Sequence, residues 1–183
     1  FNWETPLLPI HILWVNLVTD SLPALALGVE PAEKDIMDRK PRDPEGKIFD
    51  KGMIRRVVYQ GLMVALLSLT AFKIGERVDT VTGQTMAFAV LTFSQLIHAY
   101  NVRSNTKSIF NIGLFSNRRL LGATAVSVLL QLAVLLIPAL NKLFKVTSLD
   151  AVHWLIVLAL SFVPILIVEV VKLLGLNSTE DEI

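Results

Sequence analysis

The sequence predicts an all-α protein, a polytopic membrane helix bundle of five transmembrane helices, and three observations support this fold class. The chain of 183 residues is 53% hydrophobic and only 18% charged, whereas soluble domains average about 45–50% and about 25%. Its apolar residues gather in five runs, each near the roughly 20 residues that span a bilayer. None of these runs shows the alternation of apolar and polar residues that is typical of a half-buried strand.

The five runs define a single membrane domain with short polar connections. In chain order we expect an outer loop at 1–6, spans at 7–29, 53–75, 84–102, 120–140 and 151–174, cytoplasmic loops at 30–52 and 103–119, and a cytoplasmic tail at 175–183. The N-terminal residues FNWETPLLPIH lack the basic region and cleavage site of a signal peptide. We therefore expect the chain to be a piece of a larger protein.

Basic residues in the connections predict the orientation of the bundle. The loops 30–52 and 103–119, with the start of the second span, carry twelve Lys and Arg residues, while the two opposite connections and their flanks carry four. Those two loops share a side with the C-terminus, so we expect this side to be cytoplasmic. With a net charge of +1, no cysteine and no basic strip interleaved with aromatic residues, nothing in the sequence predicts a nucleic-acid partner or a thiolate metal site.

The first span carries three oxygen-bearing side chains at membrane depth. Asn16, Thr19 and Asp20 stand at i, i+3 and i+4, positions that share a face of an α-helix. Carboxylate, amide and hydroxyl oxygens suit hard cations such as calcium. Because an aspartate at the centre of a spanning helix costs about 2.5–3.5 kcal/mol on insertion scales, an acid there is a candidate functional residue.

A proline follows this polar face within one helical turn. Pro23 cannot donate an amide hydrogen bond to the residue four before it, Thr19, so we expect that carbonyl to be freed beside Asp20. Such helix breaks coordinate ions in transporters. The alternative is that Asn16 and Thr19 join neighbouring helices by hydrogen bonds and that Asp20 pairs with a basic residue.

Further ligands must come from other helices, because calcium takes six to eight oxygens. In the third span Thr92, Gln95 and His98 stand at i, i+3 and i+6. Gln95 could offer a neutral oxygen to the ion or hydrogen-bond to Asp20, while a packing hydrogen bond is an equal alternative. The missing anions are expected outside this chain.

Other polar and small residues in the spans are interpreted as structural. The fourth span carries a polar stripe that we expect to join helices, and the second carries small residues that permit close helix approach. The last span carries an acid and a lysine that could pair or reach the interface. These residues are Thr124, Ser127 and Gln131; Gly61 and Ser68; and Glu169 and Lys172.

Residues 14–42, WVNLVTDSLPALALGVEPAEKDIMDRKPR, closely resemble the sixth membrane helix and following cytoplasmic loop of P-type calcium-transporting ATPases. The five-helix layout resembles the sixth to tenth helices of that family. The resemblance implies that Asn16, Thr19 and Asp20 are calcium ligands. It also implies that the loop 30–52 couples to a phosphorylation domain; in its charged, proline-containing part the residues of interest are Glu30, Pro31, Asp35, Asp38, Arg39 and Arg42. A solvated loop is the alternative interpretation of that segment.

Two departures from the family pattern bear on how many ions are carried. Ser21 stands where members that carry two calcium ions have glycine, and Gln95 where they have a glutamate ligand. The resemblance therefore implies one calcium ion per cycle, exchanged for protons.

The resemblance also implies what a complete pump needs beyond this chain. No DKTG phosphorylation motif occurs here, so ATP and magnesium would be bound by an N-terminal remainder that also supplies the fourth and fifth helices, and the piece alone should be inactive. We expect an integral protein of a bacterial plasma membrane. The alternatives are a non-catalytic module that packs against partner helices and a pump for sodium, manganese or protons.

Overall fold

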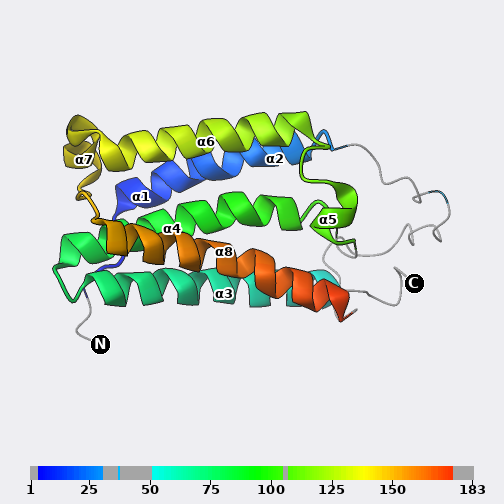
Figure 1. The fold of residues 1–183 in the computed structure, drawn as a ribbon, viewed down its shortest axis with the longest axis horizontal. Coiled ribbons are helices and arrows are strands. Elements are labelled where there is room, and N and C mark those ends of the chain that lie inside the picture. Colours follow the sequence, from blue (N-terminus) through cyan, green and yellow to red (C-terminus); the bar gives the residue numbers. More distant parts are fainter. Residues whose placement is uncertain (1–3, 31–36, 38–50, 105–106, 175–183) are drawn as a thin grey trace.

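The chain folds into helices that run roughly along one long axis, as the computed structural model shows for residues 4–30, 37, 51–104 and 107–174 (Figure 1). In chain order the helices are α1 (Pro9–Trp14), the π-helix η1 (Val15–Asp20), α2 (Ser21–Leu27), α3 (Lys51–Gly75), α4 (Thr80–Asn101), α5 (Ile109–Ile112), α6 (Arg118–Leu136), α7 (Pro138–Phe144) and α8 (Ala151–Leu173). No strand occurs among these residues. The all-α membrane bundle that the composition predicts is confirmed.

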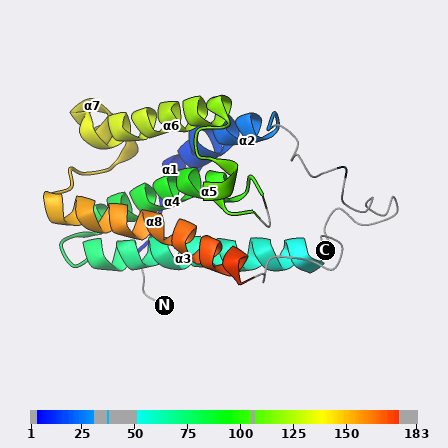
Figure 2. The same cartoon turned by 45° about the vertical axis from the view of Figure 1, so that its right-hand side comes forward.

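Helix α4 forms the centre of the bundle. It packs against α3 and α8 on one side, and against α6 and the first span on the other. Figures 1 and 2 show α4 between these two layers, with α6 beside α2 in one and α8 beside α3 in the other. In its first half, Met86, Phe88 and Val90 have no exposed surface, so this half of the helix contacts protein on nearly every side.

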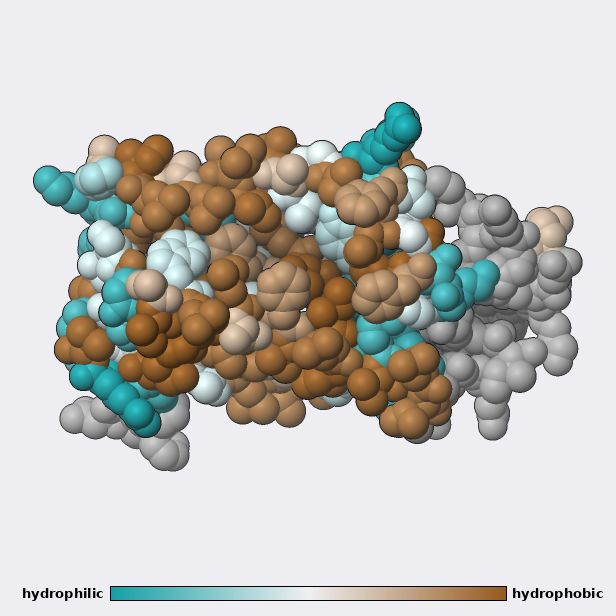
Figure 3. Space-filling model, in the orientation of Figure 1, coloured by the Kyte–Doolittle hydropathy of each residue, from teal (hydrophilic) through white to brown (hydrophobic). Residues whose placement is uncertain are grey.

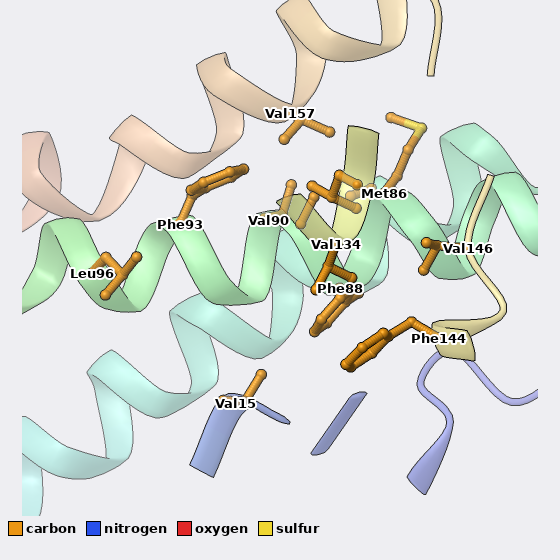
Figure 4. Close-up of a cluster of buried hydrophobic side chains, with 13 residues drawn as sticks. Val15, Met86, Phe88, Val90, Phe93, Leu96, Val134, Phe144, Val146 and Val157 are labelled. Atoms are coloured by element: carbon orange, nitrogen blue, oxygen red, sulfur yellow. The ribbon is translucent and has the colours of Figure 1, made fainter. Parts of the chain in front are cut away.

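The apolar core surrounds that half of α4 (Figure 4). The rings of Phe88 and Phe144 are nearly parallel, at 10°, with centroids 6.5 Å apart. Val15 of the first span and Val157 of α8 complete the core from opposite sides. Four segments that are distant in sequence therefore meet here, and burying aliphatic or aromatic side chains of this size contributes about 1.5–3 kcal/mol each.

Four helical stretches of the described residues are long and apolar enough to cross a membrane, whereas the sequence predicts five spans. They are Pro9–Leu27, Gly52–Gly75, Arg118–Leu136 and Ala151–Leu173. The remaining predicted span, 84–102, corresponds to α4, which has 22 residues but a more polar sequence. Its neighbours shield α4 from lipid, so its side chains can be polar where they face protein.

The surface agrees with a membrane domain. Large apolar side chains are exposed on α2, α3, α6 and α8, including Leu25, Leu62, Leu129 and Leu166. In Figure 3 apolar residues cover the middle of the visible face, and hydrophilic residues lie mainly toward its two ends. An exposed apolar band of this kind suits contact with lipid chains rather than water.

Helices α3 and α4 approach each other closely at two glycines. A Cβ atom placed on Gly83 would lie 2.8 Å from the carbonyl oxygen of Phe72, and one on Gly75 would lie 2.8 Å from the Cα of Gly83. Gly61, which the sequence suggests for such a contact, has no heavy atom within 4 Å of a Cβ position. The glycines that permit this close approach therefore lie at and beside the turn between the two helices.

Candidate cation-binding site

The first span changes its helical form at the polar residues that the sequence singles out. Residues Val15–Asp20 form a π-helix between two short α-helices. In a π-helix each carbonyl accepts from the amide five residues later, and such turns occur frequently at functional sites. The backbone thus departs from α-helical geometry over the segment that holds Asn16, Thr19 and Asp20.

Three hydroxyl groups bind backbone carbonyls along this segment. The Thr19 hydroxyl donates to the carbonyl of Val15 at 2.8 Å, and the Ser21 hydroxyl donates to the carbonyl of Asn16 at 2.8 Å. Ser127 of α6 donates to the carbonyl of Val18 at 3.0 Å. Side chains therefore contribute to the hydrogen bonding of a backbone that is no longer a regular α-helix.

Pro23 lies in the first turn of α2, where a proline is tolerated. The α-helical pattern predicts that Pro23 frees the carbonyl four residues before it, that of Thr19. The carbonyl of the preceding residue, Val18, accepts the hydroxyl of Ser127 from α6. A donor from another helix thus lies next to the carbonyl that Pro23 cannot serve.

The structure separates the three predicted ligands by exposure. Asn16 and Asp20 are exposed on the outside of the chain, whereas Thr19 is buried with its hydroxyl turned to its own helix. Within the described part of the chain, the Asp20 carboxylate forms neither a salt bridge nor a hydrogen bond with a neighbouring helix. The two groups that could bind a cation most directly therefore face away from the rest of this bundle.

Gln95 lies in α4, the helix that packs against η1. Its amide oxygen is buried, and so is the hydroxyl of Thr92 one turn earlier; neither forms a hydrogen bond with the described residues. Buried oxygens without a donor are uncommon in folded proteins. His98, on the same helix, is bound to Gln60 of α3 at 3.2 Å and approaches Asn101 at 3.3 Å, so it serves helix packing.

The described residues contain no group of three or more His, Cys, Asp and Glu side chains that could hold a metal ion. Asp20 with Asn16 offers one carboxylate and one amide oxygen, and calcium takes six to eight oxygens. A complete site for a hard cation therefore needs ligands from outside the part of the chain that the structure describes.

The N-terminal end of the first span is fixed by contacts that the sequence did not reveal. His11 is buried and stacks on Phe88, with ring centroids 4.5 Å apart. Its Nε2 donates to the carbonyl of Phe144 at 2.7 Å, and its Nδ1 accepts from the amide of Leu8 at 3.3 Å. Because Phe144 is 133 residues further along the chain, no local pattern could have indicated this contact.

The polar stripe of α6 contacts the same span, as the packing interpretation predicts. Gln131 accepts a hydrogen bond from Trp14 at 2.9 Å, and Ser127 donates to Val18. Thr124 is the exception, because its buried hydroxyl has no partner among the described residues. Two members of the stripe therefore hold the π-helical segment against α6.

The end of the first span and the loop that follows it are only partly described. Glu30 is partly buried and bound to Arg103, with Nη2 to Oε1 at 2.6 Å. The other residues of interest in the predicted coupling loop lie outside the described residues; these are Pro31, Asp35, Asp38, Arg39 and Arg42. Glu30 therefore uses its carboxylate within the bundle.

The last span carries a buried ion pair near its end. Glu169 and Lys172 are 3.5 Å apart, and Glu169 also accepts from the hydroxyl of Ser108 and, at 3.2 Å, from the amide of Ile109. Lys172 donates to the carbonyl of Asn101 at 2.8 Å. These contacts join α8 to the residues that follow α4, so the pairing that the sequence suggested is present.

The fold and the broken first span define a class of protein, a multi-pass helical membrane domain with an acid at a helix break. A family model described as "Cation transporting ATPase, C-terminus" matches residues 4–174. The chain belongs to this family, as the resemblance of its first span to P-type calcium-transporting ATPases predicts.

Individual relatives agree with this family. The chain is 44% identical over 194 residues to Calcium-transporting ATPase 1 of Bacillus cereus, which covers 96% of this chain and 22% of that protein. It is 41% identical to Calcium-transporting ATPase of Bacillus subtilis, covering 87% and 18%. It is 34% identical to human Calcium-transporting ATPase type 2C member 1, covering 93% and 19%. The chain spans about a fifth of the length of the curated relatives that it matches.

Proposed function

We propose that this chain is the C-terminal membrane part of an ATP-driven calcium pump and supplies part of the site through which the ion passes. The observation that carries the proposal is the exposed Asp20 carboxylate beside the π-helical break. An acid in a membrane span that has no basic partner within the described bundle needs another compensating interaction, and a transported cation provides one. The curated relatives are named as calcium-transporting ATPases.

The exposed face of the first span is where the rest of the pump would complete the site. Asn16 and Asp20 would contribute oxygens there, and the N-terminal remainder would supply the further anions that calcium requires. Thr19 would contribute through its backbone, because its hydroxyl is already bound to Val15. Gln95, with a buried oxygen that no described residue satisfies, would either join the ion or bind Asp20.

The pump would work by alternating access. ATP and magnesium would be bound by the N-terminal remainder, where an aspartate would be phosphorylated. Phosphorylation would shift the helices around Asp20 between arrangements that open to opposite sides of the membrane. The loop 30–52 would carry this movement, because it leaves the first span on the side of Glu30 and returns to α3.

The distribution of basic residues supports an orientation with the C-terminus in the cytoplasm, in the plasma membrane of a bacterium. Two of the relatives come from Bacillus species. In this orientation the turn between α3 and α4 lies outside the cell, and α5 lies at the cytoplasmic surface.

Replacing Asp20 in the complete pump tests the proposal. Asp20→Asn should abolish calcium-dependent phosphorylation from ATP, because the amide removes the charge that attracts the ion. Phosphorylation from inorganic phosphate should persist, since it does not require the ion. Phosphoenzyme is measured with radiolabelled ATP and with radiolabelled phosphate over a range of calcium concentrations.

The matched control is Asp150→Asn, which changes an exposed acid at the start of α8 and should leave both reactions unchanged. Full calcium dependence in Asp20→Asn would contradict the proposal. The same assay with sodium, manganese and protons as the varied ion identifies the cargo. Stable assembly of the pump without any cation dependence would indicate a helix-packing module instead.

A further inference from the structure

A buried arginine lies directly beyond the central helix. Arg103 follows α4, and only 1% of its side chain is exposed. It donates to the carbonyl of Gly113 at 2.9 Å and to the hydroxyl of Ser116 at 2.6 Å. Its remaining donors go to Glu30, with Nε at 3.0 Å and Nη2 at 2.6 Å from the same carboxylate oxygen. One guanidinium thus joins the connection between α4 and α6 to the end of the first span.

Glu30 and the last turn of α2 are bound by a second residue as well. Asn117, the N-cap of α6, is buried and donates to the second carboxylate oxygen of Glu30 and, at 3.3 Å, to the carbonyl of Ala26. Its own side-chain oxygen accepts from the amide of Leu120 at 2.9 Å. We call Glu30, Arg103 and Asn117 the inner clamp. It ties the exit of the ion-binding helix to the ends of α4 and α6.

Apolar contacts support the same junction. Ala26 of α2, Ala99 of α4 and Leu120 of α6 form a small buried cluster beside the inner clamp. The small size of the two alanines allows the three helices to approach closely. The end of α2 is therefore held both by packing and by directed hydrogen bonds.

The inner clamp lies where it can affect the orientation of Asp20. Helix α2 has seven residues, so it is a rod of about 10 Å at 1.5 Å per residue. At one end the rod joins the π-helical segment, and at the other it meets the inner clamp. A segment that departs from α-helical hydrogen bonding is a natural point of bending. The contacts of the inner clamp at the C-terminal end of α2 therefore influence the tilt of α2 and the orientation of Asp20.

Stability alone is a weak explanation for a buried ion pair. Moving both charges out of water costs several kcal/mol, and well-packed apolar residues are often as stabilising. An arginine adds geometric specificity, because the five N–H donors of its planar guanidinium fix the positions of several partners at once. Here those partners belong to the first span and to the connection between α4 and α6.

We propose that the inner clamp is a positioning device that holds the ion-binding helix in its cation-accepting arrangement. Arg103 and Glu30 do not touch the ion; they act through α2 on Asp20. This inference rests on the proposed pump function. It assigns Glu30 to the interior of the membrane domain rather than to the surface that meets the phosphorylation domain.

The test uses the complete pump with Arg103→Gln, Glu30→Gln and both changes together. The readout is the calcium concentration that gives half-maximal phosphorylation from ATP, with the amount of pump normalised to phosphorylation from inorganic phosphate. Arg103→Gln should raise that concentration at least about fivefold, because the arrangement that accepts the ion is less populated. The double variant should recover part of the loss, because neither charge is left unpaired.

Arg119→Gln is the matched control, since Arg119 is exposed on α6 and should show wild-type calcium dependence. If Arg103→Gln does not fold, Arg103→Lys gives the same test with a smaller expected shift, because an ammonium cannot serve all three partners in one plane. Variants that lose thermal stability at unchanged half-maximal calcium would overturn the positioning role. A wild-type pump without calcium dependence would overturn the proposed function itself.

Discussion

Asp79 shows how a single side chain begins a helix on the predicted outer side of the membrane. Its carboxylate accepts from the amide of Thr82 at 2.8 Å and from the hydroxyl of Thr82 at 2.9 Å. These bonds favour the charged form and lower the pKa of Asp79 below its usual value of 3.8. Because the folded-state pKa is lowered, the stabilisation is present above the usual pKa and is lost as pH falls through the lowered value.

Asp79→Ala should therefore lower the stability of the complete pump by about 1 kcal/mol, as expected for the loss of an N-cap. The difference from wild type should be constant between about pH 5 and 8, because Asp79 stays charged throughout. Thermal denaturation in detergent measures it at each pH. Asp79→Asn, which keeps an oxygen acceptor, is the control. A difference that narrows already near neutral pH would show that another group is responsible.

At the level of single residues, the sequence predicts those features of the site that depend on neighbouring residues in the chain. An aspartate and a proline within an apolar run are visible in any reading of residues 14–28, and they predict a break at membrane depth. The form of that break was not predictable. Its π-helical geometry accompanies a hydroxyl from Ser127, which is 109 residues away from Val18.

The residues of the inner clamp escaped prediction for the same reason. Glu30 was assigned to the coupling loop, and Arg103 was counted only among the basic residues of its connection. The two lie 73 residues apart, and each has several opposite charges nearer in sequence. The packing of α2 against α4 and α6 brings them together.

Helices α3 and α4 approach each other closely at Gly75 and Gly83. Gly83→Ala should separate these helices, because the added methyl carbon would lie 2.8 Å from the Phe72 carbonyl and 3.0 Å from the Glu76 amide. Backbone atoms cannot turn aside as a side chain can, so overpacking should cost about 1–3 kcal/mol.

Gly122→Ala is the matched change on α6, where a Cβ meets nothing within 4 Å. It should leave stability unchanged or raise it slightly, because alanine is the better helix former. The measurement is the midpoint of thermal denaturation of each purified pump variant. Equal midpoints for the two variants would contradict the close approach of α3 and α4.

Single residues determine where several of the helices begin and end. The predicted fourth span, 120–140, contains Pro138, and α6 ends at Leu136 because the residue before a proline is extended. Pro138 then begins α7 as its first residue. In α4 the first turn was not predicted, because Thr80 and Thr82 offer no apolar periodicity and the cap at Asp79 is the only local signal.

For the whole molecule, the acids that this chain supplies bear on how many ions the pump would carry. Asp20 is the one acid of the predicted ligand set, and α4 offers Gln95 rather than a carboxylate. We therefore propose that the complete pump binds one calcium ion per phosphorylated site, with protons carried in return. Radiolabelled calcium bound per phosphoenzyme measures this ratio, and a value near two would contradict it.

The fold class and the multi-pass membrane character follow from composition and run length, because lipid imposes the same requirements on all spanning helices. The arrangement of the helices around α4 does not follow from them. Neither does the exposure of Asn16 and Asp20, which depends on how the π-helical segment turns the first span against α6.

The shielded position of α4 also bears on how the domain is made. A helix this polar gains little by entering lipid alone, since each unmatched polar group lowers its preference for the bilayer. Its short turn to α3 and the contact at Gly75 and Gly83 allow the two to insert as a hairpin. Biogenesis of this domain would then include the insertion of a helix pair, around which the later helices assemble.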